Sequence, residues 1–162
     1  MNHTAWVAPL FAAALILLCW GCYPKPVGPK GPEGKQLTWN EMSFEQRTAH
    51  MDEAVLPRVA VIFAEWRPDR FGNGNVDCTL CHRQGLQEGQ IQMPTADLPR
   101  LSGDLLLGTE FSEHPDTTQL KLDRLVPTVS EALGLKSFSI ATRRGFGCYS
   151  CHFGPSGPMY GN

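Results

Sequence analysis

The sequence predicts a mainly α protein of short helices and long loops, in which two halves of the chain follow one plan. Three observations predict this architecture. Apolar residues recur at helical spacing in 44–66 and again in 116–133, and each stretch contains one proline. A Cys-x-x-Cys-His pentapeptide follows each stretch, at 78–82 and 148–152. The two prolines are 70 positions apart, and so are the two pentapeptides.

The first apolar stretch is expected to form a helix from about Phe44 to Trp66. Ser43 followed by Gln46 fits a capping box, in which each side chain bonds the backbone N–H of the other residue. Pro57 lacks the N–H that a helical hydrogen bond needs, so we expect a kink or two collinear pieces there. The apolar face consists of Met51, Val55, Val59, Ile62, Phe63 and Trp66.

The second stretch repeats this plan, with Asp116 or Thr117 as the expected cap and Gly134 as the residue that ends the helix. Its apolar face consists of Leu122, Leu125, Val126, Val129 and Leu133. Because the spacing matches in both halves, we interpret the chain as a tandem repeat of a helix, a loop and the pentapeptide. The repeat units are expected at about 43–95 and 113–162, within one domain that spans 41–162.

The pentapeptide is the attachment signal for a c-type haem. Two thiols three positions apart on one turn can add to the two vinyl groups of a porphyrin, and the adjacent histidine can ligate the iron. Zinc sites use Cys-x-x-Cys pairs about 15 to 20 residues apart, whereas Cys81 and Cys148 are much farther apart. We therefore expect two covalently bound haems c. Their attachment residues are Cys78, Cys81, Cys148 and Cys151, and their proximal iron ligands are His82 and His152.

The residue opposite each proximal histidine decides the chemistry, because methionine raises the reduction potential, a second histidine lowers it and an open position binds gases. For the first haem we expect Met93, whose Met-Pro pair resembles the ligand loop of small single-haem cytochromes. The chain between His82 and Met93 reaches about 33 Å when extended, which is enough to pass round a porphyrin edge. Met51 on the first helix is the rival, and an ordinary buried loop methionine is the structural alternative for Met93.

For the second haem the candidate is Met159, which follows His152 by a Gly- and Pro-rich tail that reaches roughly 20 Å when extended. Its alternatives are His50, His114 and the absence of any protein ligand.

The N-terminus is expected to direct export. The apolar run Ala5–Leu18 is about as long as the h-region of a signal peptide and shorter than a membrane span of about 20 residues. A glycine before Cys22 resembles the lipobox of bacterial lipoproteins, which implies a signal peptide at 1–21 and a lipidated Cys22; a plain signal or an uncleaved anchor is the alternative. The Pro- and Gly-rich segment 22–40 is expected to be a linker. The domain would then face the periplasm, anchored to a bacterial membrane.

The charge balance excludes a strongly basic, nucleic-acid-binding protein, because 14 Lys and Arg residues face 16 Asp and Glu residues, for a net charge of −2. The sequence contains no nucleophile elbow or phosphate loop, so we expect no enzyme.

The pentapeptides resemble those of c-type cytochromes. A helix ahead of each one is similar to the repeats of the reaction-centre multihaem cytochrome subunit, itself a lipoprotein. The resemblance implies a carrier of single electrons between periplasmic or membrane redox partners. A haem-based gas sensor or small-ligand binder is the alternative if one iron has an open position, and the chain is too short for the substrate pocket of a di-haem peroxidase.

Overall fold

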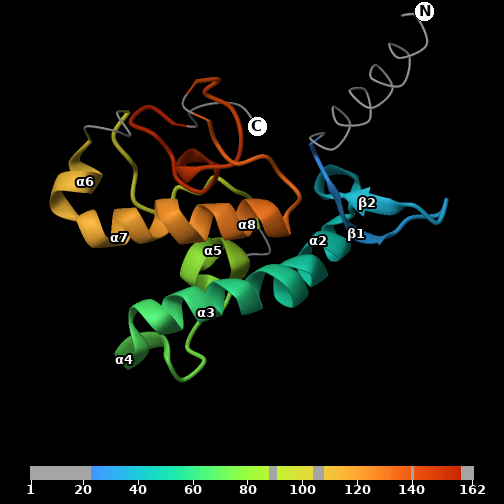
Figure 1. Ribbon diagram of the computed structural model, residues 1–162, viewed down its shortest axis with the longest axis horizontal. Coiled ribbons are helices and arrows are strands. Elements are labelled where there is room, and N and C mark those ends of the chain that lie inside the picture. The colour runs from blue at the N-terminus through green and yellow to red at the C-terminus, as the bar shows by residue number, and fades with distance from the viewer. Residues whose placement is uncertain (1–22, 88–90, 104–107, 140, 158–162) are drawn as a thin grey trace, which may run out of the picture.

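The computed structural model describes residues 23–87, 91–103, 108–139 and 141–157. Helices dominate this part of the chain, and its sheet is a single two-stranded hairpin, so the prediction of a mainly α fold is confirmed (Figure 1). None of the helices in these ranges is both long and apolar enough to cross a membrane. The expected signal peptide at 1–21, Cys22 and Met159 lie outside the described residues.

The first predicted helix extends over the expected residues as α2 (Phe44–His50), the π-helical turn η3 (Met51–Val55) and α3 (Leu56–Trp66). The capping box is present, because Ser43 N donates to Gln46 Oε1 at 2.8 Å and Gln46 N donates to Ser43 Oγ at 3.3 Å. The wider turn accommodates Pro57: Leu56 N–H bonds the carbonyl of Met51, five residues back. The expected interruption at the proline is therefore a π-turn, and the helix continues through it.

The second long helix has the same interruption. It consists of α7 (Pro115–Leu120), the π-turn η4 (Lys121–Leu125) and α8 (Val126–Ala132), and Val126 N–H bonds the carbonyl of Lys121. A short helix, α6 (Thr109–Glu113), precedes it. The predicted caps, Asp116 or Thr117, were wrong by two or three positions: His114 occupies the N-cap, because Pro115 suits the first helical position, where no N–H is needed.

The end of α8 follows the prediction. Gly134 adopts a positive φ of 64°, and its N–H bonds Glu131 O at 3.0 Å while Leu135 N–H bonds Ser130 O at 2.8 Å. These two bonds form a Schellman motif, which favours glycine at the left-handed position.

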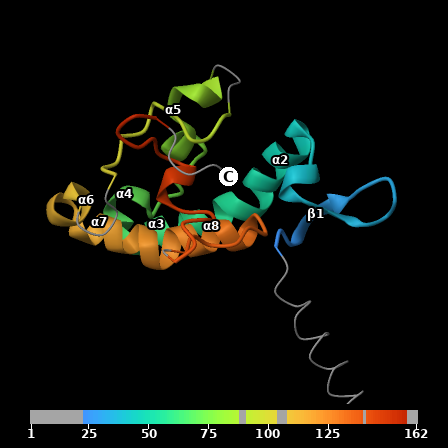
Figure 2. The same ribbon diagram turned by 90° about the horizontal axis from the view of Figure 1, so that it is seen from above.

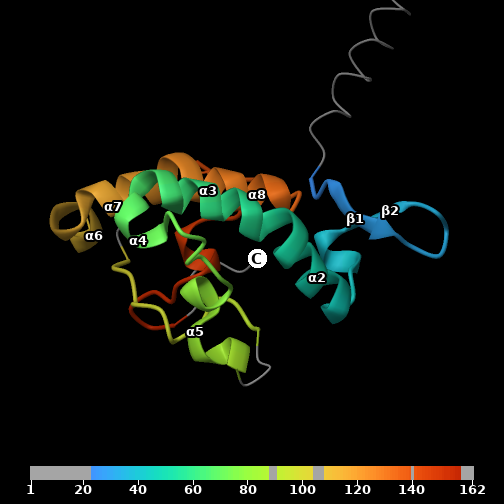
Figure 3. The same ribbon diagram turned by 90° about the horizontal axis from the view of Figure 1, so that it is seen from below.

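The two long helices lie side by side and run antiparallel, since η3 contacts α8 while α3 contacts both η4 and α8 (Figures 1 and 3). His50 ties them together, because its Nε2 donates to the Ala132 carbonyl at the end of α8, at 2.8 Å. The core lies between the helices and the loop after α3, which contains α4 (Pro68–Phe71). Its buried members are Val55, Val59, Phe63, Phe71, Val76, Ala132 and Leu133. These residues place the pentapeptides on one side of the helix pair (Figure 2).

The segment predicted as a linker differs from the expectation, because much of it is folded. Strands β1 (Pro26–Lys30) and β2 (Gln36–Thr38) form an antiparallel hairpin, followed by the 3-10 turn η2 (Trp39–Glu41). Gly28 is buried in strand β1 against the Met42 side chain, which lies 2.3 Å from the position that a Cβ would occupy. A glycine therefore lets the hairpin pack closely here. Lys25 N also donates to Gly134 O at 2.7 Å, which joins the start of the hairpin to the end of α8.

Candidate functional site

The first pentapeptide forms one helical turn at the start of α5 (Thr79–Gln87). The Asp77 carboxylate accepts a bond from Thr79 N at 2.8 Å, and the Thr79 hydroxyl holds the pKa of this carboxyl below its usual value. Cys81 N and His82 N both bond the Cys78 carbonyl, at 3.3 and 3.0 Å. This local turn gathers the two thiols and the imidazole, as their spacing predicts.

The backbone leaves this turn directly after His82. Arg83 has φ 52° and ψ −136°, a conformation that residues with a Cβ rarely adopt. Such strain costs about 1 to 3 kcal/mol and is concentrated at functional sites. It separates α5 into two pieces and ends the helical turn at the histidine.

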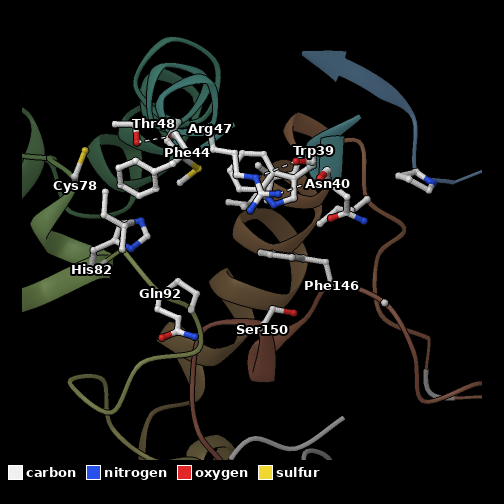
Figure 4. Close-up of a pocket in the computed structure, with 18 of the residues that line it drawn as sticks. Trp39, Asn40, Phe44, Arg47, Thr48, Cys78, His82, Gln92, Phe146 and Ser150 are labelled. Atoms are coloured by element: carbon white, nitrogen blue, oxygen red, sulfur yellow. Dashed lines mark hydrogen bonds between the residues drawn. The ribbon is translucent and has the colours of Figure 1, made fainter. Parts of the chain in front are cut away.

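A cavity of about 910 Å³ opens beside this turn, near the upper end of the ~300–1,000 Å³ range of ligand pockets. Its apolar lining includes Trp39, Phe44, Met51, Leu86, Ile91, Met93, Val129, Leu133, Leu135 and Phe146. Cys78 and His82 lie on one side of it, and the His82 imidazole points inward (Figure 4). Phe44, which lines this space, is 55% exposed, so it presents an apolar ring there.

The His82 imidazole is half-buried, and one of its nitrogens lacks a hydrogen bond within the described residues. Burial lowers the pKa of its imidazole. Its Nδ1 is buried and has no hydrogen-bond partner among the described residues. An unmade buried hydrogen bond costs about 1 to 3 kcal/mol. A group bound at this imidazole could offset that cost.

The Cys78 thiol interacts with the first long helix. Its Sγ donates to Asp52 Oδ1 at 3.2 Å, and burial, followed by this hydrogen bond and the Asp52 charge, raises the pKa of the thiol. All four pentapeptide cysteines are free thiols. Burial raises the pKa of Cys81 and Cys148 as well, so these sulfurs are protonated near neutral pH.

The second pentapeptide repeats the backbone pattern of the first. The 3-10 turn η5 (Cys148–Ser150) begins it, and Cys151 N and His152 N bond the Cys148 carbonyl at 3.2 and 3.0 Å. His152 Nδ1 lies 2.8 Å from the Pro99 carbonyl. Since a carbonyl only accepts, Nδ1 carries the proton and Nε2 keeps its lone pair, as in metal-ligating histidines. Burial lowers the pKa of His152, although the bond to Pro99 opposes the shift.

The chain after the first pentapeptide holds the second one in place. Thr95 N bonds Cys151 O at 3.2 Å, and Leu101 N bonds Phe153 O at 2.9 Å. Arg100 donates to the Gly154 carbonyl at 3.0 Å, and the Tyr149 hydroxyl bonds the Ser102 carbonyl. The roles of residues 95–102, including Pro99, were not predicted, and this stretch carries no motif that could have indicated them.

The two pentapeptides lie close together. Burial raises the pKa of the Cys151 thiol to about 12, and negative charge on Cys81 and Cys148 adds to the shift. Ser150 of the second pentapeptide also lines the cavity that contains Cys78 and His82. Residues 70 positions apart in sequence therefore share one region of the fold.

The structure brings both candidate methionines for the first haem into the cavity of His82. Met93 and Met51 are half-buried, and each contributes to the lining. The prediction that one of them is the sixth ligand therefore stays a prediction with two candidates.

The other candidates lie elsewhere or are already bonded. His50 uses Nε2 to bond the Ala132 carbonyl, and His114 is exposed between α6 and α7. Within the described ranges, no three His, Cys, Asp or Glu side chains converge as a site for a metal ion would require.

No known protein family, no curated protein and no solved structure matches this chain.

Proposed function

We propose that the protein is a di-haem c-type cytochrome that passes single electrons between redox partners. The observation that carries this proposal is the pair of Cys-x-x-Cys-His turns, each with free thiols and an imidazole whose pKa burial lowers. A haem iron in each site would supply the one-electron chemistry, with its potential set by the axial ligands and the surrounding burial. The protein residues would bind and orient this group.

In this proposal Cys78 and Cys81 hold the first haem, and Cys148 and Cys151 hold the second. Each thiol would be joined to the haem as a thioether, with its sulfur on one vinyl carbon and its hydrogen on the other, so the attachment would need no oxidant. His82 and His152 are the proximal ligands. Neutral imidazole is the form that binds a metal, and the lowered pKa of both histidines favours it.

The helix interruptions support a tandem repeat of the haem-binding unit. The π-turns η3 and η4 each cover five residues and begin 70 positions apart, at Met51 and Lys121. The backbone bonds inside the two pentapeptides are also equivalent. Because a π-turn is rare and marks functional sites, its occurrence at matching positions favours a duplicated unit.

The closeness of the two pentapeptides supports electron transfer between the two haems, since electrons entering at one iron would have a short route to the other. The apolar run before residue 19 and the Gly-Cys pair at 21–22 support export, with Cys22 as the site of a lipid anchor.

The test is a haem count on protein made in a host that carries cytochrome c maturation. Pyridine haemochrome absorbance and intact mass should both give two haems per chain, and the double variant Cys148→Ala/Cys151→Ala should give one. A colourless protein from that host would overturn the proposal. Carbon monoxide added to the reduced protein distinguishes a carrier from a gas binder. A haem with two protein ligands does not bind the gas, so its spectrum stays unchanged.

A further inference from the structure

The charges that line the cavity are unevenly distributed. Among the described residues that line it, the one carboxylate is Asp52, whose Oδ1 lies 3.2 Å from the Cys78 sulfur. The cations in the same part of the lining are Arg47, Lys136 and Arg144. An anionic group entering this cavity would therefore be repelled at the Cys78 side and attracted toward the cations.

Lys136 and Arg144 are held together by the loop that precedes the second pentapeptide. Phe146 N bonds Lys136 O at 2.8 Å, and Ser139 N bonds Arg144 O at 3.0 Å, so both residues flank Phe146. Figure 4 shows Phe146 on the side of the cavity away from Cys78 and His82. Neither cationic side chain has an ion pair or hydrogen bond within the described residues, and both are exposed.

Arg47 extends this cationic side from the first long helix. Its Nε donates to the Trp39 carbonyl and one Nη to the Asn40 carbonyl, both at 3.1 Å, and the guanidinium lies 5.5 Å from the Trp39 ring centre. These contacts orient the group and use two of its five N–H donors. The remaining donors are available to a carboxylate.

We propose that Arg47, Lys136 and Arg144 bind the propionates of the haem attached at Cys78 and Cys81. This inference rests on the proposed function. A porphyrin of this type carries its vinyl groups and its propionates on different edges, so attachment at the Cys78 side of the cavity directs the two carboxylates to the other side. Three cations there match two negative charges, and Arg can bond a carboxylate with two parallel N–H donors.

The test compares holoproteins from the maturation host. The double variant Lys136→Gln/Arg144→Gln keeps every attachment residue, so it should still carry two haems. We expect a lower midpoint potential for one haem only, because nearby cations favour the less positive ferrous iron. We also expect the propionate bending band in resonance Raman to shift. Arg144→Lys, which keeps the charge, should retain most of the parent potential.

The matched control is Arg58→Gln, which removes an exposed cation from α3 outside the cavity lining. Unchanged potential and Raman band in the double variant would overturn the inference, and so would an equal shift in the Arg58 control. If the double variant loads no haem, Arg47→Gln provides the same readouts on a single position. A parent protein that carries no haem contradicts the proposed function itself. A parent that carries two haems, with variants of unchanged potential and Raman band, contradicts this inference alone.

Discussion

The Cys151 thiol should be strongly protected from alkylation in the folded, haem-free chain. Its pKa of about 12, against an ordinary value of 9.0, is a difference of three units. At pH 8 this difference lowers the thiolate fraction about a thousandfold relative to the unfolded chain. A more basic thiolate is also a better nucleophile: its intrinsic rate rises with pKa, with a Brønsted coefficient of about 0.4 to 0.5. This effect offsets the lower thiolate fraction roughly 20- to 30-fold. The net prediction is alkylation about 30 to 50 times slower, before any steric protection.

The assay is iodoacetamide labelling at pH 8 with and without urea, followed by peptide mass spectrometry, which reports each cysteine separately. Cys78 is the internal control, because its sulfur is less buried and should be labelled sooner in the folded chain. Equal labelling rates for Cys151 in the folded and unfolded chains would refute the reasoning, since they would mean that water reaches this sulfur. The same result would remove the main support for close packing of the two pentapeptides.

Two further predictions concern stability. Gly134→Ala should lower the free energy of unfolding by about 2 to 3 kcal/mol. One part of this loss is the cost of a left-handed φ for alanine. The other part is the loss of the Lys25 hydrogen bond, because the new Cβ would stand 2.3 Å from Lys25 O. Gly74→Ala, with φ 76° and open space around it, is the matched control and should lose only the conformational part in urea titrations; equal losses would contradict the clash. The haem-free chain should also weaken on acidification, because His82 and His152 have pKa values below 6.5 when folded. Below pH 6.5 the unfolded chain binds more protons, so stability present above pH 6.5 is lost as the pH falls through the folded pKa values. A variant with both histidines replaced by Gln should show a smaller loss between pH 7 and 5, and an identical loss would count against buried neutral imidazoles.

Local patterns in the sequence were sufficient for the two long helices and for the two pentapeptide turns. The Ser43 capping box and the Gly134 helix end involve bonds between residues three to five positions apart, so the sequence alone contains both partners. The same is true of the pentapeptide turns, whose thiols and imidazole are gathered by bonds to the first cysteine carbonyl. Pro57 indicated an interruption, although its form, a π-turn ahead of the proline, was not predicted.

The tertiary structure decided everything that joins distant parts of the chain. Asp52 meets Cys78 across 26 positions, Pro99 meets His152 across 53, and His50 meets Ala132 across 82. The sequence near one partner of such a pair contains no pattern that indicates the other. The two residues meet only because the chain reverses direction and the helices pack together. For the same reason the hairpin looked like a linker: its proline and glycine content describes a flexible chain in isolation, whereas contacts with Met42 and the end of α8 hold it in the fold.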